Sequence, residues 1–325
     1  MYTMLINKNS SIKNIIKSFL DAIIINDNFK KFISNNKLNQ LIDLKIRYFT
    51  LYNKKSGIPL IKSYCKIKYD FIKKINEEYC FAKFSAYSLL DINNQGFDSI
   101  TTSTYICLLK KISNHWFIEY ISDIESLEYS IDYKNLDDFV HIYNSLLDKE
   151  ISKYNSLLLN FNTLNINFNN TLQTTSILKK TLYKKTKAVE YAEKYALTYN
   201  KEYENFNENG GDCTNFVSQV INYAGIPTSS TWKPYSNSWI RVKELRDYLI
   251  YNNLAYEIAT LNHNCIGCII QFFSPIKNTW AHSAIITYKV GNTFLYCCHS
   301  YDKLNYPLSY VYPSVYPKIR IIIPY

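Results

Sequence analysis

The chain has 325 residues, of which 47% are hydrophobic and 20% are charged, with 37 Lys and Arg against 27 Asp and Glu. These values exclude collagen-like, coiled-coil and wholly disordered proteins, and the length predicts two domains. The net charge of +10 is diffuse, without an arginine-rich stripe or a nucleic-acid-binding motif, so we expect a solvated basic surface and no nucleic-acid partner.

The first 27 residues carry a basic stretch but no clean signal peptide, because Asp21 interrupts the apolar run and no small-residue cleavage site follows. No segment approaches the roughly 18 apolar residues that a membrane span requires. We therefore expect a cytoplasmic protein whose eight cysteines are mostly free thiols. Release by lysis or by a non-classical export route would bring such a protein to an external substrate.

Residues 1–125 are predicted to form an α+β domain. Apolar residues recur at helical spacing in 10–25 and 28–52, and the segments after Pro59 alternate between apolar and polar residues and are rich in β-branched and aromatic side chains. Helices followed by an antiparallel meander fit this pattern. The element order resembles that of cystatin-like or nuclear-transport-factor-like domains, which implies a packing or partner-binding role without catalysis.

Residues 126–177 connect this domain to a second one at 178–325. A predicted helix occupies 126–158, and the polar Asn/Thr tract at 159–175 is predicted to be a linker. The second domain opens with a helical pattern from Thr181 to Tyr199. Short predicted strands follow at 268–273, 282–290, 293–300 and 318–325.

The stretch Gly210-Gly211-Asp212-Cys213 begins the segment that is most informative about chemistry. Apolar residues after Cys213 follow helical spacing until Gly225, a usual helix stop. Cys213 is therefore expected in the first turn of a helix, where the helix dipole favours a thiolate and lowers the thiol pKa. Such a cysteine suits nucleophilic attack, although a lone cysteine is more often buried and inert.

A nucleophilic thiol needs a base, and that base needs an orienting partner. His282 begins one predicted strand and His299 ends the next, with Gly291-Asn292 as the hairpin turn between them. The two histidines are thus expected to be neighbours in space. Each alone is more often structural, but a cysteine at a helix start followed by both of them favours a catalytic site.

The second domain resembles the putative amidase domain family of the papain-like cysteine peptidase superfamily, and so is similar to CHAP and NlpC-type cell-wall amidohydrolases. The matching segments are Lys187–Ala192, 210–219, Gly225–Pro227, Ser238–Trp239, Gly267–Phe272, Ala281–Ala284 and His299–Asp302. The resemblance implies a papain-like fold, in which the helix bearing the cysteine packs on an antiparallel sheet. It also implies a cofactor-free amidase or peptidase that works through an acyl-thioenzyme, with peptidoglycan peptide as the substrate class.

The same resemblance implies roles for single residues. Cys213 would be the nucleophile, His282 the general base and then the acid, and the Cys213 backbone amide an oxyanion donor. His299 would orient His282, with Asp302 and Asn305 as competitors for that role.

Polar support would come from residues next to the nucleophile on the same helix, namely Asp212, Asn215 and Gln219, and Asp212 has the alternative of a helix cap. Trp239, in an aromatic loop at 228–240, would bind substrate or simply pack.

One departure from the family pattern concerns cysteines. Cys268 stands where an Asp is usual, which creates a Cys-x-x-Cys with Cys265, and Cys297-Cys298 follows later. Two such pairs are compatible with zinc. Neighbouring residues on a strand point to opposite faces, however, so we expect packing cysteines and no metal.

Two other functions stay open from the sequence. A catalytically silent binding or scaffold protein would retain the fold, and an acyltransferase or deamidase would use the same three residues.

Overall fold

The computed structural model describes residues 2–24, 28–58, 60–92, 98–127, 131–163 and 182–325. The chain forms two compact units, and the predicted α+β class is confirmed. The first unit comprises Met1–Tyr52, Leu60–Gln95 and Thr101–Leu164, and the second comprises Asn53–Pro59, Gly96–Ile100 and Asn165–Tyr325. The linker predicted at 159–175 falls largely outside the described residues.

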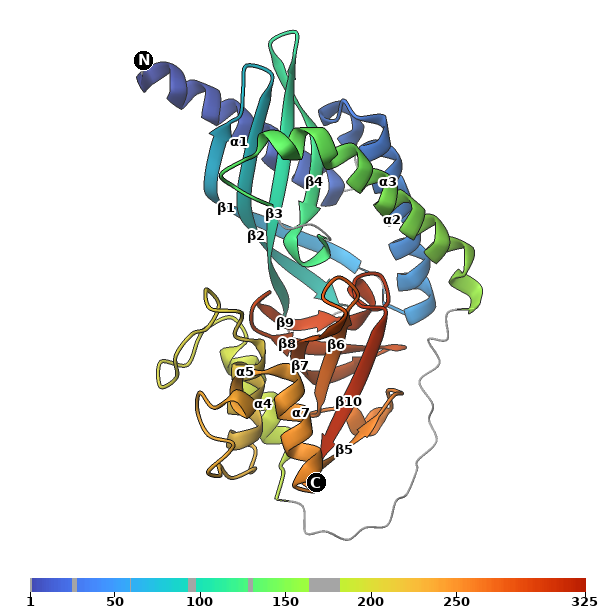
Figure 1. Ribbon diagram of the computed structural model, residues 1–325. Helices are drawn as coiled ribbons and strands as arrows, with labels where there is room; N and C mark the ends of the chain where they lie inside the picture. Colours follow the sequence, from blue (N-terminus) through green and yellow to red (C-terminus); the bar gives the residue numbers. More distant parts are fainter. Residues whose placement is uncertain (1, 25–27, 59, 93–97, 128–130, 164–181) are drawn as a thin grey trace. The chain divides into compact units, whose positions relative to one another are not determined.

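The first unit combines a β-meander with helices (Figure 1). Its elements are α1 (Tyr2–Ile24), η1 (Phe29–Phe32), α2 (Asn36–Ser56), β1 (Leu60–Lys74), β2 (Tyr79–Ile92), β3 (Ser99–Ile112), β4 (His115–Asp123), η2 (Ile124–Ser126), α3 (Asp137–Leu159) and η3 (Phe161–Thr163). Strand β1 pairs with β2 and β3 with β4, both antiparallel. The β3–β4 turn uses Ser113 and Asn114, both at positive φ. Helix α3 buries Phe139 and Tyr143 and counts with the first unit.

The second unit combines helices with antiparallel strands that pair in one sheet. Its elements are α4 (Lys185–Tyr195), α5 (Cys213–Tyr223), α6 (Asn237–Ile240), α7 (Val242–Tyr251), β5 (Ala255–Ile258), η4 (His263–Cys265), β6 (Ile269–Ser274), β7 (Thr279–Val290), β8 (Thr293–Cys298), β9 (Lys303–Pro307), η5 (Leu308–Tyr310) and β10 (Lys318–Pro324). The strand order is β9-β8-β7-β6-β10-β5. The predicted strands correspond to β6, β7, β8 and β10, whereas the short β5 and β9 were not predicted.

Two apolar layers lie on the two faces of this sheet, because successive side chains of a strand point to opposite faces. Ile285 and Cys297 pack with the helices α4, α5 and α7, which cover one face in Figure 1. Ala284 and Cys298 pack with the other layer. The prediction that Cys297 and Cys298 point to opposite faces is therefore confirmed.

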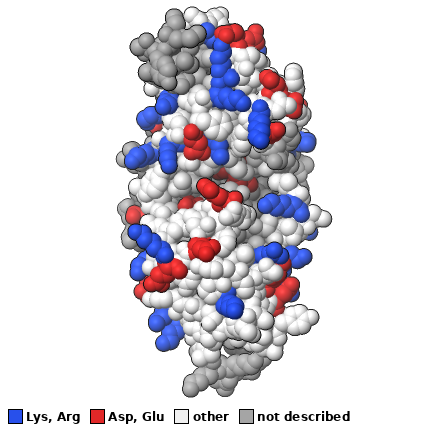
Figure 2. Space-filling view, turned by 60° about the vertical axis from the view of Figure 1, so that its left-hand side comes forward, with Lys and Arg blue, Asp and Glu red and all other residues white. Residues whose placement is uncertain are grey.

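The surface carries mixed charge. On the face shown in Figure 2, Lys and Arg side chains are interspersed with Asp and Glu instead of gathering in one patch. Within the described residues, no helix is long and apolar enough to cross a membrane.

Gly225 ends α5 in a backbone conformation that only glycine adopts easily, and it gives a test of this packing. Its φ is +123°, and an added Cβ would lie 2.3 Å from the carbonyl oxygen of Leu182. Gly210 has a φ of +100° but nothing within 4 Å of an added Cβ. We expect Gly210→Ala to cost roughly 1 to 3 kcal/mol from backbone strain alone. Gly225→Ala should cost about 2 kcal/mol more because of the clash. Urea unfolding followed by tryptophan fluorescence measures both, and equal losses would contradict the close contact at Leu182.

Candidate active site

Cys213 is the first residue of α5, and its side chain lies against strand β7. It is 7% exposed. The backbone N–H of Ser283 hydrogen-bonds to the sulfur, and Sγ lies 3.7 Å from Thr214 Oγ1. The Thr214 hydroxyl in turn lies 3.3 Å from Ser283 Oγ. The first turn of α5 is thus attached to one residue of β7.

Burial dominates the ionisation of this thiol. It raises the pKa of Cys213 above its ordinary value, the hydrogen bonds from Ser283 and Thr214 oppose the rise, and the charge of Asp212 adds to it. The lower pKa expected from the helix dipole is therefore wrong for this structure, because desolvation of a thiolate outweighs the dipole. Cys213 rests as a neutral thiol.

His282 immediately precedes Ser283 in β7, and its imidazole is enclosed by aromatic rings. The rings of Phe272, Tyr301 and Tyr316 have centroids 5.6, 5.6 and 6.1 Å away. Burial, together with the positive charges of Lys303 and Lys277, lowers the pKa of His282 to about 3. His282 is therefore a neutral imidazole at neutral pH.

The two candidate catalytic residues are linked through the backbone of Ser283 and not by a hydrogen bond between their own side chains. His282 Nε2 is buried and has no hydrogen-bond partner among the described residues. Within the same residues, no hydrogen bond joins the imidazole to Cys213 Sγ. The Ser283 hydroxyl faces α5, whereas the His282 ring packs on Phe272, as alternation along a strand requires.

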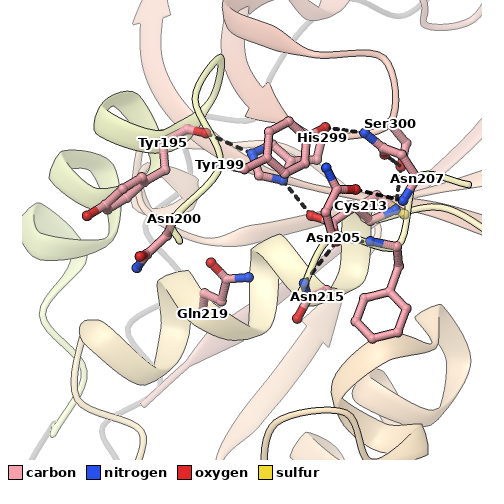
Figure 3. A network of polar contacts seen from close by, with 12 residues as sticks. Tyr195, Tyr199, Asn200, Asn205, Asn207, Cys213, Asn215, Gln219, His299 and Ser300 are labelled. Carbon is pink, nitrogen blue, oxygen red and sulfur yellow. Dashed lines mark hydrogen bonds and ion pairs between the residues drawn. The ribbon is translucent and has the colours of Figure 1, made fainter. Parts of the chain in front are cut away.

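His299 is engaged by Asp212 and not by His282. Its Nδ1 lies 2.6 Å from Asp212 Oδ2, and its Nε2 lies 2.7 Å from the carbonyl oxygen of Tyr195. Figure 3 shows the contact between the His299 ring and the backbone of Tyr195. With both ring nitrogens occupied, His299 does not orient His282 in this structure, and that prediction is corrected.

The two competitors for the orienting role also have other partners. Asp302 Oδ1 accepts a hydrogen bond from the Tyr199 hydroxyl at 2.8 Å, and burial raises the pKa of the Asp302 carboxyl. Asn305 donates to Glu193 Oε1 at 2.8 Å. Neither side chain hydrogen-bonds to His282.

The Asp212 carboxylate is the centre of a buried polar network. Its Oδ1 accepts from the backbone N–H of Phe206 and from Asn215 Nδ2, both at 2.9 Å. Asn215 also donates to the Glu204 carbonyl oxygen and accepts from Trp239 Nε1 at 2.8 Å. Asp212 occupies the N-cap position of α5, as the alternative predicted, but its side chain makes no capping hydrogen bond to the helix.

Gln219 was predicted to give polar support and Trp239 to bind substrate or pack, and both side chains have contacts within the protein. Gln219 accepts from the Tyr191 hydroxyl at 3.0 Å, and six residues of helix place it roughly 9 Å along the axis from Cys213. It is therefore too far away to support an oxyanion there. Trp239 is 0% exposed and packs on Trp232, with ring centroids 4.7 Å apart. The prediction that Trp239 binds substrate is wrong, because the indole belongs to the core.

The cysteines of the Cys-x-x-Cys segment are buried near backbone acceptors. Cys268 Sγ donates to the Asn264 carbonyl oxygen at 3.4 Å, and burial raises the pKa of Cys268 to about 12. Among the residues that the structure describes, no group of three or more His, Cys, Asp and Glu is arranged to hold a metal ion.

Comparison with known proteins agrees with the expected family. The model of the family described as "Putative amidase domain" matches residues 182–323. The predicted resemblance is therefore confirmed for residues 182–323, which match the model of that family.

Two proteins of Bacillus subtilis (strain 168) are similar in sequence. "Uncharacterized protein YjcM" is 33% identical over 205 residues, which cover 57% of this chain and 47% of that protein. "Uncharacterized protein YhbB" is 29% identical over 153 residues, covering 42% and 48%. The chain thus spans about half the length of the curated relatives it matches. No solved structure matches the chain.

The buried, neutral state of His282 makes stability depend on pH. The folded state holds this imidazole unprotonated down to about pH 3, against an ordinary pKa of 6.5. Between these values the unfolded chain binds more protons than the folded protein, so the free energy of unfolding decreases as the pH falls below 6.5. Two pH units correspond to roughly 2 to 3 kcal/mol. The free energy of unfolding of His282→Gln should therefore fall by about that amount less than the wild-type value when the pH is lowered from 7 to 4.5.

Denaturant unfolding at both pH values measures this difference. The exposed His141 provides a matched control, since His141→Gln should run parallel to the wild type. A parallel course for His282→Gln would show that the imidazole is not held neutral by burial.

Proposed function

We propose that the chain is a cysteine-dependent amidohydrolase whose second unit is papain-like, with Cys213 as nucleophile and His282 as base. One observation carries the proposal: Cys213 starts α5 with its sulfur against the backbone N–H of Ser283, the residue after His282. A thiol and an imidazole are thereby anchored at adjacent points of α5 and β7. The match of residues 182–323 to the putative amidase domain family supports the reaction class.

The resting pair is neutral, and this defines the first step. Burial raises the pKa of the Cys213 thiol and lowers that of His282 to about 3. The imidazole is therefore free to accept a proton, and the thiolate forms only as it attacks. The two side chains must come into contact when substrate binds, since catalytic contacts in substrate-free enzymes are often loose.

The chemistry then follows from these two groups. Cys213 Sγ bonds to the amide carbonyl carbon while the thiol proton passes to His282. The resulting oxyanion accepts a hydrogen bond from the backbone N–H of Cys213. The C–N bond breaks as His282 returns the proton to the leaving amine, which leaves a thioester. Water then attacks the thioester, giving its proton to His282, and the carboxylic acid departs as the thiol is restored.

Peptidoglycan peptide is the substrate class that we propose, by analogy with the family. Muropeptides and simple acyl amides offered in parallel separate this class from general amidase activity. Faster cleavage of the simple amides would remove the cell-wall peptide from the proposal while leaving the amidohydrolase chemistry in place.

Substitution of the two catalytic residues tests the chemistry itself. Cys213→Ala and His282→Ala should each lower kcat/KM for amide hydrolysis by about 1,000-fold or more, since the nucleophile and its base act as one unit. Cys107→Ala is the matched control, because this buried cysteine lies in β3 of the first unit. It should keep the wild-type rate when its fold is intact by circular dichroism.

The alternatives make different predictions in the same assay. A silent scaffold hydrolyses no amide, and Cys213→Ala then changes nothing but stability. An acyltransferase or deamidase loses activity in both variants but passes the acyl group to an added amine or releases ammonia from a glutamine side chain. Hydrolysis that survives Cys213→Ala would contradict the proposal.

A further inference from the structure

The contacts of His299 require two donated protons. Nδ1 faces a carboxylate oxygen of Asp212 at 2.6 Å, and Nε2 faces the Tyr195 carbonyl oxygen at 2.7 Å. The Tyr195 carbonyl oxygen only accepts, and so does the Asp212 oxygen when that carboxyl is ionised. A neutral imidazole carries one N–H, so beside an ionised Asp212 one of these contacts would place two lone pairs against each other. With Asp212 as a carboxylate, which also accepts from Phe206 and Asn215, only the imidazolium satisfies both contacts, and distances this short are typical of charge-assisted hydrogen bonds.

The surroundings of the ring suit a cation. The rings of Tyr199 and Phe216 lie on His299 with centroids 4.0 and 4.2 Å away, and aromatic faces attract cations. The His299 and Asp212 side chains are each 1% exposed. A buried charge of this kind persists only with a fully hydrogen-bonded partner. Asp212 meets that condition, because Phe206 and Asn215 also donate to it.

The pair lies directly beside the proposed nucleophile. Asp212 precedes Cys213, and its negative charge raises the pKa of the Cys213 thiol. The Asp212 backbone N–H also donates to Ser300 Oγ at 2.6 Å. Asp212 is therefore bonded to Cys213 along the chain and hydrogen-bonded to the segment after β8.

Resting on the proposed function, we propose that His299 is a positioning residue that acts through Asp212. As a permanent imidazolium it neutralises the carboxylate next to Cys213, so that the thiol can ionise during attack. Asp212 and His299 therefore form one unit with no net charge. This role differs from orienting the base, since His299 reaches the nucleophile through residue 212 and not through His282.

Other ionisable groups around the unit are few among the described residues. Asp302 interacts electrostatically with His299 and accepts from the Tyr199 hydroxyl, which lies over the ring. On the β7 side, His282 is influenced by Lys303 and Lys277. Because these groups are unchanged in the variants below, differences between variants report on residues 212 and 299.

The test follows the pH dependence of Cys213 alkylation by iodoacetamide, with labelling located by peptide mass mapping. His299→Gln should move the midpoint up by roughly one pH unit, because Asp212 is left uncompensated, and Asp212→Asn should move it down. The double variant should return close to the wild type. Glu193→Gln is the control, since this carboxylate pairs with Asn305 and should leave the midpoint unchanged.

Shifts of the same sign in both single variants, or no shift, would overturn the proposal, because a merely structural pair produces no sign reversal. Alkylation needs no amide turnover, so a failure here is distinguishable from a failure of the amidohydrolase proposal.

The wild-type protein gives a second readout if the variants do not fold. Labelling with 15N-histidine should show both ring nitrogens of His299 protonated at pH 7.5, its signals being assigned by eliminating those of the other four histidines through their own variants. A single protonated nitrogen would overturn the proposal.

Discussion

The buried carboxylate of Asp212 organises the start of α5, and the candidate site depends on it. It accepts hydrogen bonds from the backbone of Phe206, from Asn215 and from His299. These donors belong to the loop before the helix, the helix itself and the segment after β8. A carboxylate removed from water is very costly without such partners. The three segments therefore have to come together, and Cys213 is the next residue along the chain.

Two histidines with similar burial have different partners. His282 is 3% exposed and His299 is 1% exposed, yet only His299 has an acceptor at each ring nitrogen. His282 has aromatic rings around it and an Nε2 without a partner among the described residues, so desolvation lowers its pKa. A neutral imidazole thus lies in β7, whereas the histidine beside the nucleophile is held by a carboxylate oxygen and a carbonyl oxygen.

Local patterns were sufficient to predict much of the second unit. Alternation located β6, β7, β8 and β10, and the spacing after Gly210-Gly211 located Cys213 at a helix start. Contacts between distant residues were not predictable in this way. Asp212 and His299 are 87 positions apart, and Trp239 in an aromatic loop fits a core as well as a groove. The ionisation of Cys213 was also mispredicted, because a sequence shows the helix dipole but not the depth of burial.

The most direct measurement is to trap the acyl group on the protein during turnover of an amide substrate. A reaction with a muropeptide is quenched in acid, digested and mapped by mass spectrometry, with hydroxylamine treatment to release thioesters. The account predicts the acyl mass on the peptide that contains Cys213, sensitive to hydroxylamine. Substrate consumed with no acyl group on Cys213, or with the acyl group on another residue, would contradict it.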